Sequence, residues 1–276
     1  MLLYRIGPQG AYAAAEQGGE PRALLSDPYA TPPASWELGQ PVPLGGDGLP
    51  RGVLAPVAPG KIVGIGRNYR DHAAELGNPM PAEPVIFLKA PSSVIGPGAA
   101  VVLPAASRQV EYEGEIALVV GRRIHRASRR QAAAAVFGVT AACDVTARDL
   151  QRRDPTFARG KSFDTFCPLG PAIRVGADLE DLEVVTRVDG AERQRGHARQ
   201  MAWGLVELVA YASGIMTLEP GDVLLTGTPA GVGTLAAGNR LEVEVSGVGT
   251  LVLRVEAEAP AVTDDPVAAG LREGAG

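Results

Sequence analysis

The sequence of 276 residues contains little cysteine and no long apolar run. Its two cysteines, Cys143 and Cys167, form neither a CxxC pair nor a disulfide framework, which excludes a small disulfide-rich secreted protein. The longest nearly apolar stretch, residues 132–143, is far shorter than a membrane span. Gly7 and Pro8 come too early for the apolar core of a signal peptide. We therefore expect a cytoplasmic protein with no membrane partner.

Lysine is also scarce, and neither sign of charge dominates the chain. Lys and Arg total 26 against 31 Asp and Glu, so the formal net charge is −5. This mild acidity predicts no nucleic-acid partner. Only Lys61, Lys89 and Lys161 are lysines, which leaves 26 − 3 = 23 arginines. In such a background, each retained lysine weakly indicates a position that needs a compact point charge.

Proline, glycine and chain length suggest three parts. Residues 1–55 predict a small irregular N-terminal region, because eight of the 23 prolines lie between Pro28 and Pro59. Residues 56–260 form the main domain, and the composition of residues 261–276 is typical of a loose tail. With 46% apolar and 21% charged residues, the chain has the composition of a globular protein.

The main domain has more strand patterns than helix patterns. We expect strands over residues 2–6, 61–66 and 84–89, and hairpins over residues 184–194 and 241–255, where Asp-Gly and Ser-Gly mark the turns. Helical patterns cover residues 69–76, 128–136 and 203–211. This mixture, without regular alternation of strand and helix, predicts a β-rich α+β fold.

A run of alternating glutamates is the most informative segment. In a strand, Glu111, Glu113 and Glu115 point to the same face, and the apolar residues that follow indicate a buried end. Such a face is either solvated or neutralised by a hard cation with oxygen ligands, such as Mg²⁺ or Mn²⁺. Asp144 follows another apolar run and is either a third ligand or a loop cap beside an exposed Arg148–Asp149 pair.

Six motifs in order resemble the fumarylacetoacetate hydrolase family over residues 56–257. They are GRNYRDHAAE at 66–75, FLKAPSS with IGPG at 87–98, YEGE at 112–115, DVTARDLQ at 144–151, GKSF at 160–163 and TGTPAGVG at 226–233. The resemblance implies a catalytic domain over residues 56–260 with a rolled mixed β-sandwich. It also implies a homodimer and a divalent-metal site that acts on small 2-oxo or enol acids.

The resemblance assigns roles to individual residues. Its metal ligands are Glu113, Glu115 and Asp144, which would hold Mg²⁺ or Mn²⁺, with Ca²⁺ as a further candidate, and Glu111 is an outer carboxylate. Its catalytic residues are His72 and Glu75, a general base and the carboxylate that orients it, and Lys161, which faces the C2 oxygen of the substrate. Its substrate-binding residues are Arg67, Tyr69, Lys89, Arg148, Gln151 and Thr228.

Other features of the chain add little chemistry or depart from the family pattern. The glycine loop at residues 226–233 lacks the lysine of a phosphate-binding loop, so we interpret it as a turn lining the acid pocket. His125 and His197 have no partners in the sequence, and we expect them to be exposed. Cys143 replaces an Asn common in relatives, and residues 196–203 lack the polar pattern usual before this helix.

The expected reaction is hydrolysis of a carbon–carbon bond in an acylpyruvate-type β-diketo acid through a metal-bound enolate. This interpretation is favoured because both residues of the expected water-activating pair, His72 and Glu75, are present in the sequence. The alternatives are isomerisation or decarboxylation of a 2-hydroxy-diene-dioate in aromatic catabolism, or decarboxylation of oxaloacetate. A non-catalytic binding protein is the remaining alternative, and the retained acidic, histidine and lysine positions disfavour it.

Overall fold

The computed structural model describes residues 1–75, 77 and 79–259, so the tail expected at residues 261–276 lies outside the described residues. The helices are α1 (Arg70–Glu75), α2 (Arg129–Ala135), α3 (Arg148–Gln151), α4 (Ala158–Lys161) and α5 (Leu205–Ile215). Within the described ranges, no helix has the length and apolar character needed to cross a membrane.

The largest sheet has eleven strands, most of them in the order β4-β3-β2-β1-β13-β11-β10-β16-β5-β6, with β7 paired to β13. Its strands are β1 (Leu2–Ile6), β2 (Ala11–Ala15), β3 (Arg22–Leu24), β4 (Leu38–Pro41), β5 (Ile62–Gly66), β6 (Val85–Lys89), β7 (Val94–Ile95), β10 (Gly114–Val120), β11 (Val136–Cys143), β13 (Cys167–Val175) and β16 (Val223–Leu225). The sheet is mixed, because β5–β16 and β7–β13 are parallel pairs among antiparallel neighbours.

Two smaller sheets complete the fold. The five-stranded sheet has the order β15-β14-β18-β19-β8, and the three-stranded sheet has the order β12-β9-β17. Their strands are β8 (Ala100–Leu103), β9 (Val110–Tyr112), β12 (Thr146–Ala147), β14 (Glu183–Val188), β15 (Ala191–His197), β17 (Gly233–Thr234), β18 (Arg240–Val245) and β19 (Gly249–Ala257). These sheets confirm the predicted β-rich α+β class.

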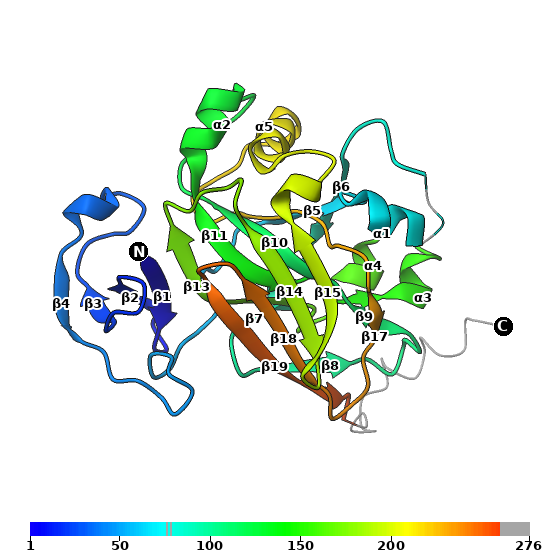
Figure 1. Cartoon of the computed structure of the whole chain (residues 1–276), viewed down its shortest axis with the longest axis horizontal. Helices are drawn as coiled ribbons and strands as arrows, with labels where there is room; N and C mark the ends of the chain where they lie inside the picture. The colour runs from blue at the N-terminus through cyan, green and yellow to red at the C-terminus, as the bar shows by residue number, and fades with distance from the viewer. Residues whose placement is uncertain (76, 78, 260–276) are drawn as a thin grey trace, which may run out of the picture.

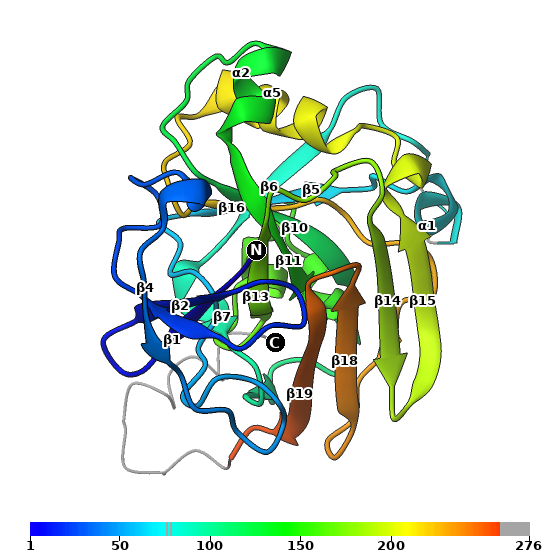
Figure 2. The ribbon, with the colours of Figure 1, turned by 60° about the vertical axis from the view of Figure 1, so that its left-hand side comes forward.

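The large and five-stranded sheets pack face to face through β10, β11 and β13 against β14, β18 and β19 (Figures 1 and 2). The position of strand β10 between two cores explains why its sequence is almost wholly apolar. Ile116 and Leu118 point into the core between the sheets, whereas Ala117 and Val119 point into a second core on the other face. Because both faces are covered, every residue of β10 is buried.

The N-terminal region is more regular than its proline content predicted. Strands β1 to β4 extend the large sheet, with Leu2 and Leu3 of β1 paired to Arg174 and Ile173 of β13 (Figure 1). The prolines between residues 28 and 59 lie in connections or, as Pro41 does, at the end of the edge strand β4. Proline fits there because an edge strand leaves one row of N–H positions unpaired.

The Asp-Gly turn signal is confirmed. Asp189 and Gly190 join β14 to β15 with φ values of 52° and 78°, as a tight hairpin turn requires. Ser128 caps α2 with Gln131 as a capping box. Helices α2 and α5 pack together at one end of the sandwich, away from α1, α3 and α4 (Figure 1).

Candidate metal and acid-binding site

Three buried carboxylates converge where β10 starts and β11 ends. Glu113 immediately precedes β10, Glu115 is its second residue, and Asp144 follows β11. The register pairs Gly114 with Cys143, and the Asp144 N–H donates to the Glu113 carbonyl at 2.8 Å. This pairing places one carboxylate oxygen from each of Glu113, Glu115 and Asp144 within 4.8 Å of the others.

The glutamate run is interrupted, although we expected one strand across it. Strand β9 ends at Tyr112 and pairs with β12 and β17, whereas β10 starts at Gly114 in the large sheet. Glu111 therefore lies away from the three converging carboxylates. It accepts hydrogen bonds from Arg148 Nε at 2.7 Å and Gln109 Nε2 at 2.6 Å, which fits the outer position expected for it.

Two lysines and an arginine neutralise much of this acidic cluster. Lys161 Nζ donates to Glu113 Oε2 at 2.7 Å and Asp144 Oδ2 at 2.5 Å. Lys89 Nζ donates to the other oxygen of Asp144 at 2.6 Å. Arg148 pairs with both Glu113 and Glu111. All of these side chains are at least nine-tenths buried, so each pair is formed in a medium that screens charge weakly.

The protonation of the carboxylates follows from these contacts. Burial raises the pKa of Glu113, but Lys161 and Arg148 more than offset that effect and hold the pKa well below its usual value. Burial, together with the charges of Asp144 and Glu113, raises the pKa of Glu115 well above its usual value. Only the Gly227 N–H, at 2.7 Å, donates to Glu115 among the described residues. The protein's own groups thus compensate a charge on Glu115 poorly and favour its neutral, protonated form.

The donor set fits a hard divalent cation. Mg²⁺ and Ca²⁺ bind oxygen ligands at about 2.0–2.6 Å, so oxygens within 4.8 Å of one another can share one ion. Glu113, Glu115 and Asp144 provide only oxygen, and no histidine or cysteine joins them in the described part of the chain. A bound cation would supply the charge compensation that Glu115 lacks.

His72 and Glu75 form the expected pair on α1. His72 Nδ1 lies 3.2 Å from Glu75 Oε2, and His72 is buried with its ring on the wall of the cavity. Glu75 is fixed in turn by the Gly231 N–H, which lies 3.0 and 3.2 Å from its two oxygens. A carboxylate in this position favours the tautomer with a proton on Nδ1 and a free lone pair on Nε2.

The glycine loop lies under the acidic cluster and holds it in place. Thr228 Oγ1 donates to the Gly114 carbonyl at 2.8 Å and accepts from Gln194 Nε2 at 2.7 Å. Gly227 has a φ of 96°, and a Cβ at this position would lie 2.8 Å from the Asn68 side chain. The sequence therefore needs glycine here for both conformation and space. The loop contacts Glu115 through a backbone N–H, as a turn lining an acid pocket would.

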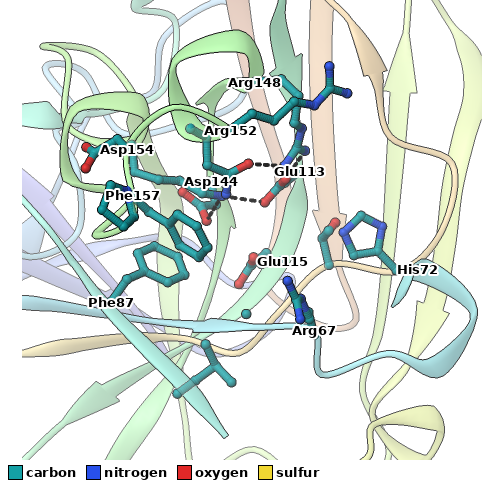
Figure 3. Close-up of a pocket in the computed structure, with 16 residues that line it drawn as sticks. Arg67, His72, Phe87, Glu113, Glu115, Asp144, Arg148, Arg152, Asp154 and Phe157 are labelled. Atoms are coloured by element: carbon teal, nitrogen blue, oxygen red, sulfur yellow. Dashed lines mark hydrogen bonds and ion pairs between the residues drawn. The ribbon is translucent and has the colours of Figure 1, made fainter. Parts of the chain in front are cut away.

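These elements enclose a cavity of about 330 Å³. Figure 3 shows Phe87 and Phe157 on one side of the carboxylates and His72 and Arg67 on the other. The cavity is lined by Ile65, Gly66, Arg67, His72, Phe87, Glu113, Glu115, Asp144, Arg148, Gln151, Arg152, Asp154, Pro155, Phe157, Lys161 and Thr228. Nine of the twelve residues expected in the site therefore line one cavity, and Glu75 lies directly behind His72.

Lys89 and Tyr69 do not line this cavity, although we expected both to bind substrate. The Lys89 side chain is fully buried, and its ammonium donates to Asp144 and to the Val145 carbonyl. It therefore positions a carboxylate in this structure. Tyr69 is 3% exposed and lines a separate cavity with Arg70 and Asp71.

Sequence reasoning gave no site role to seven residues of the cavity wall: Ile65, Gly66, Phe87, Arg152, Asp154, Pro155 and Phe157. Arg152 lies four residues after Arg148, a spacing that places both on the same side of a helical turn. This spacing is a signal that could have identified Arg152. Phe157 has a φ of 63° and meets Phe87 with ring centroids 6.1 Å apart. No sequence pattern predicts that left-handed conformation for an aromatic residue.

The other reactive residues lie outside the cavity lining. His125 is exposed, as expected, and His197 is partly exposed and accepts a hydrogen bond from the Arg199 N–H at 3.1 Å. Cys143 and Cys167 are free and buried. Burial raises the pKa of Cys143 and raises the pKa of Cys167 to about 12, so both thiols stay neutral and unreactive.

Comparisons with known proteins agree with the site. Residues 61–256 match the fumarylacetoacetate (FAA) hydrolase C-terminal family. A human mitochondrial oxaloacetate tautomerase is 42% identical over 215 residues, covering 73% of this chain and 68% of the relative. A 2-hydroxyhepta-2,4-diene-1,7-dioate isomerase from Mycobacterium marinum (36% identity, TM-score 0.82) and a fumarylacetoacetate hydrolase from Exiguobacterium antarcticum (34%, 0.80) share the fold. Each structural match covers 94% of this chain and all of the other.

Proposed function

The chain belongs to the fumarylacetoacetate hydrolase family, and on this premise we propose that it moves a proton at C3 of a 2-oxo acid, interconverting keto and enol forms. One observation carries the proposal. His72, oriented by Glu75, lines the same cavity as Glu113, Glu115 and Asp144, so a general base lies beside a candidate cation site. Proton transfer next to a carbonyl needs that combination.

The three carboxylates would hold the cation, which supplies the positive charge that favours the enolate form of a 2-oxo acid. His72 accepts the C3 proton on Nε2, while Glu75 stabilises the resulting imidazolium, which then returns the proton to the C2 oxygen to give the enol or to C3 to give the keto form. Lys161 uses two N–H groups for Glu113 and Asp144, and its third can donate to the C2 oxygen as negative charge develops there. Burial of Lys161 strengthens that interaction.

Relatives named for proton transfers support this reaction over the hydrolysis expected from the sequence. The oxaloacetate tautomerase and the diene-dioate isomerase both interconvert isomers. Hydrolysis of an acylpyruvate-type substrate is the second candidate, because His72 and Glu75 could also activate water and a fumarylacetoacetate hydrolase shares the fold.

The test measures C3 proton exchange directly. The protein, loaded with Mg²⁺ or Mn²⁺, is given a panel of 2-oxo acids in D₂O, and deuterium uptake at C3 is followed by NMR. His72→Gln should slow uptake by about 10²- to 10⁴-fold, the usual cost of losing a general base. The exposed His125→Gln is the control and should leave uptake unchanged. An unchanged rate in His72→Gln, with metal retained, contradicts the proposal.

The same panel decides the second candidate when it includes acylpyruvates. Hydrolysis releases pyruvate and a carboxylic acid, whereas proton transfer returns the carbon skeleton intact. Stoichiometric release of pyruvate at a rate matching or exceeding deuterium uptake would favour the hydrolase. Deuterium uptake without pyruvate would favour the tautomerase or isomerase.

A further inference from the structure

Lys161 binds two of the three carboxylates that would hold the cation. Its ammonium donates to Glu113 Oε2 at 2.7 Å and to Asp144 Oδ2 at 2.5 Å, so one side chain bridges both residues. The same two residues belong to the set whose oxygens lie within 4.8 Å of one another. A cation bound to that set and the Lys161 ammonium would therefore draw on the same negative charge.

Neither carboxylate depends on Lys161 alone for a cationic partner. Arg148 also pairs with Glu113, and Lys89 donates to the other oxygen of Asp144 at 2.6 Å. Without Lys161, Glu113 and Asp144 would thus each keep one positive partner. The charge of Lys161 therefore needs a further explanation beyond the ionisation of these two carboxylates.

The two buried lysines differ in what they face. Lys161 lines the cavity, whereas Lys89 does not. Lys89 donates to Asp144 and to the Val145 carbonyl. Lys161 donates to two carboxylates, and no third acceptor lies within hydrogen-bond reach of its ammonium in the described part of the chain. One of its N–H groups is therefore open to a ligand in the cavity.

The charge balance of this buried cluster changes sign when a divalent ion binds. The cluster consists of four carboxylates, Glu111, Glu113, Glu115 and Asp144, and three cations, Lys89, Arg148 and Lys161. With all seven ionised, it carries one negative charge, and a divalent ion would leave one positive charge. Burial weakens screening, so an anionic ligand would stabilise the loaded cluster. Without Lys161, the loaded cluster would be neutral.

We propose that Lys161 lowers the affinity of the site for its cation and makes tight binding of the ion depend on an anionic ligand. The proposal rests on the proposed function and describes the regulation of the same site. A 2-oxo acid brings the negative charge that the loaded cluster lacks, and one of its oxygens can accept the open N–H of Lys161. The side chain that favours the enolate thereby keeps the cation exchangeable until substrate is present.

The first test measures Mn²⁺ affinity by calorimetric titration without any substrate. Lys161→Met should bind Mn²⁺ at least about tenfold more tightly than the wild type, because a neighbouring like charge is removed. Lys161→Gln should behave in the same way, since it is also neutral but can still donate to one carboxylate. Equal or weaker binding in both variants, with the wild-type circular dichroism spectrum retained, would overturn the proposal.

Lys61→Met is the matched control for both tests. Lys61 is partly exposed and pairs with Asp222 away from the cavity, so this variant should bind Mn²⁺ as the wild type does. Tighter binding in Lys61→Met that equals the gain in Lys161→Met would contradict a local effect of Lys161.

The second test measures the coupling between the ion and an acid. Saturating pyruvate should tighten Mn²⁺ binding to the wild type by about 5- to 150-fold, the usual range for two coupled ligands. The factor should be at least about fivefold smaller in Lys161→Met and unchanged in Lys61→Met. The same factor in all three proteins would contradict the dependence on an anionic ligand.

A measurement on the wild-type protein does not depend on the folding of a Lys161 variant. Lys61, Lys89 and Lys161 are the only lysines, so lysine labelled with ¹³C at the ε carbon gives three NMR signals. Paramagnetic Mn²⁺ should broaden the signals of Lys89 and Lys161 and spare that of Lys61, which Lys61→Met assigns. Broadening of none of the three signals would place the ion away from Lys161 and overturn the proposal.

Failure of the proposed function gives a different result, because Mn²⁺ affinity is measured whether or not C3 protons exchange. Absence of exchange together with tighter Mn²⁺ binding in Lys161→Met would reject the reaction and support the role of Lys161. Exchange in the wild type together with unchanged Mn²⁺ binding in Lys161→Met would support the reaction and reject that role.

Discussion

Two clusters of charged side chains in this molecule differ in burial, in the sign of their charges and in the partners they have. The site cluster contains Glu111, Glu113, Glu115, Asp144, Lys89, Arg148 and Lys161, all of them buried. The arginine loop is the segment 122–130, which follows β10 and includes the first two residues of α2; five arginines and one histidine occur in these nine residues, and all six are exposed. Its one ion pair within the described residues joins Arg123 to Glu219 at 2.8 Å, with side chains 72% and 43% exposed.

The difference shows that position, more than the number of charges, decides their energetic weight. Two unit charges 4 Å apart interact by about 1 kcal/mol in water and by about 4 kcal/mol at the effective dielectric near a protein surface. In the site cluster each charge has lost its water, so removal of one partner leaves another buried and unpaired. In the arginine loop, water replaces any lost partner. Four predictions test this contrast.

The largest effect is expected for the metal ligands. Chelation should abolish turnover, and addition of Mg²⁺ or Mn²⁺ should restore it, because Glu113, Glu115 and Asp144 are the candidate ligands. Glu113→Gln and Asp144→Asn should bind less metal and lose activity. Metal content and turnover are measured together, with exposed Glu219→Gln as the control. Full activity of the metal-free protein would contradict the site.

Arg148→Met should lower the free energy of unfolding by about 3–5 kcal/mol, since it leaves the buried Glu111 without its charged partner and Glu113 with Lys161 alone. Urea denaturation of the metal-free protein measures the change. The double variant Arg148→Met with Glu111→Gln should recover part of the loss, because it removes the charge left without a partner. A loss below about 1 kcal/mol would contradict this prediction, because that is no more than an exposed ion pair contributes.

Lys161→Met should lower kcat by about 10²- to 10³-fold with a smaller change in KM, as expected for a donor that acts on charge developing in the transition state. Initial rates with a substrate identified by deuterium uptake give both constants. Lys61→Met is the comparison, because Lys61 is partly exposed and pairs with Asp222 away from the cavity. A change confined to KM would make Lys161 an anchor for the ground state.

The smallest effect is expected for Arg123→Gln in the arginine loop. Exposed ion pairs contribute about 0–1 kcal/mol, and surface substitutions usually change stability by less than about 0.5 kcal/mol. Urea denaturation and turnover should both match the wild type, and the difference should shrink further at high salt. A loss comparable to that of Arg148→Met would break the contrast between the clusters.

The sequence predicts the chemical groups of the site better than their contacts. Period-two spacing points to Glu113 and Glu115 as carboxylates on one face, whereas His72 and Lys161 are candidates only through the family resemblance of the motifs that contain them. Lys89 was expected to meet substrate, yet it bonds Asp144, 55 positions along the chain. That direction depends on how β6 packs against α4, which no local pattern contains.

Contacts between distant segments also explain why the sequence did not predict the N-terminal strand pairing or the whole of the cavity wall. Proline counts correctly indicate many turns before residue 60, but they carry no information about the pairing of β1 with β13. Arg152 and Phe157 become part of the wall only because α3 and α4 fold against β12. Local turn chemistry, by contrast, was predictable, as the Asp189-Gly190 hairpin turn shows.

The parallel pairing of β5 with β16 affects how the protein can fold as it is made. Val223 pairs with Ile62, 223 − 62 = 161 positions earlier, and β16 also pairs with β10. At a synthesis rate of about 5–20 residues per second, β5 waits about 8–32 s for this neighbour, and β10, 225 − 117 = 108 positions earlier, waits about 5–22 s. During that interval two apolar strands present open edges on the ribosome. We expect the nascent chain to depend on chaperones. The large sheet that contains Glu115 can be completed only after β16, in the last third of the chain, has emerged.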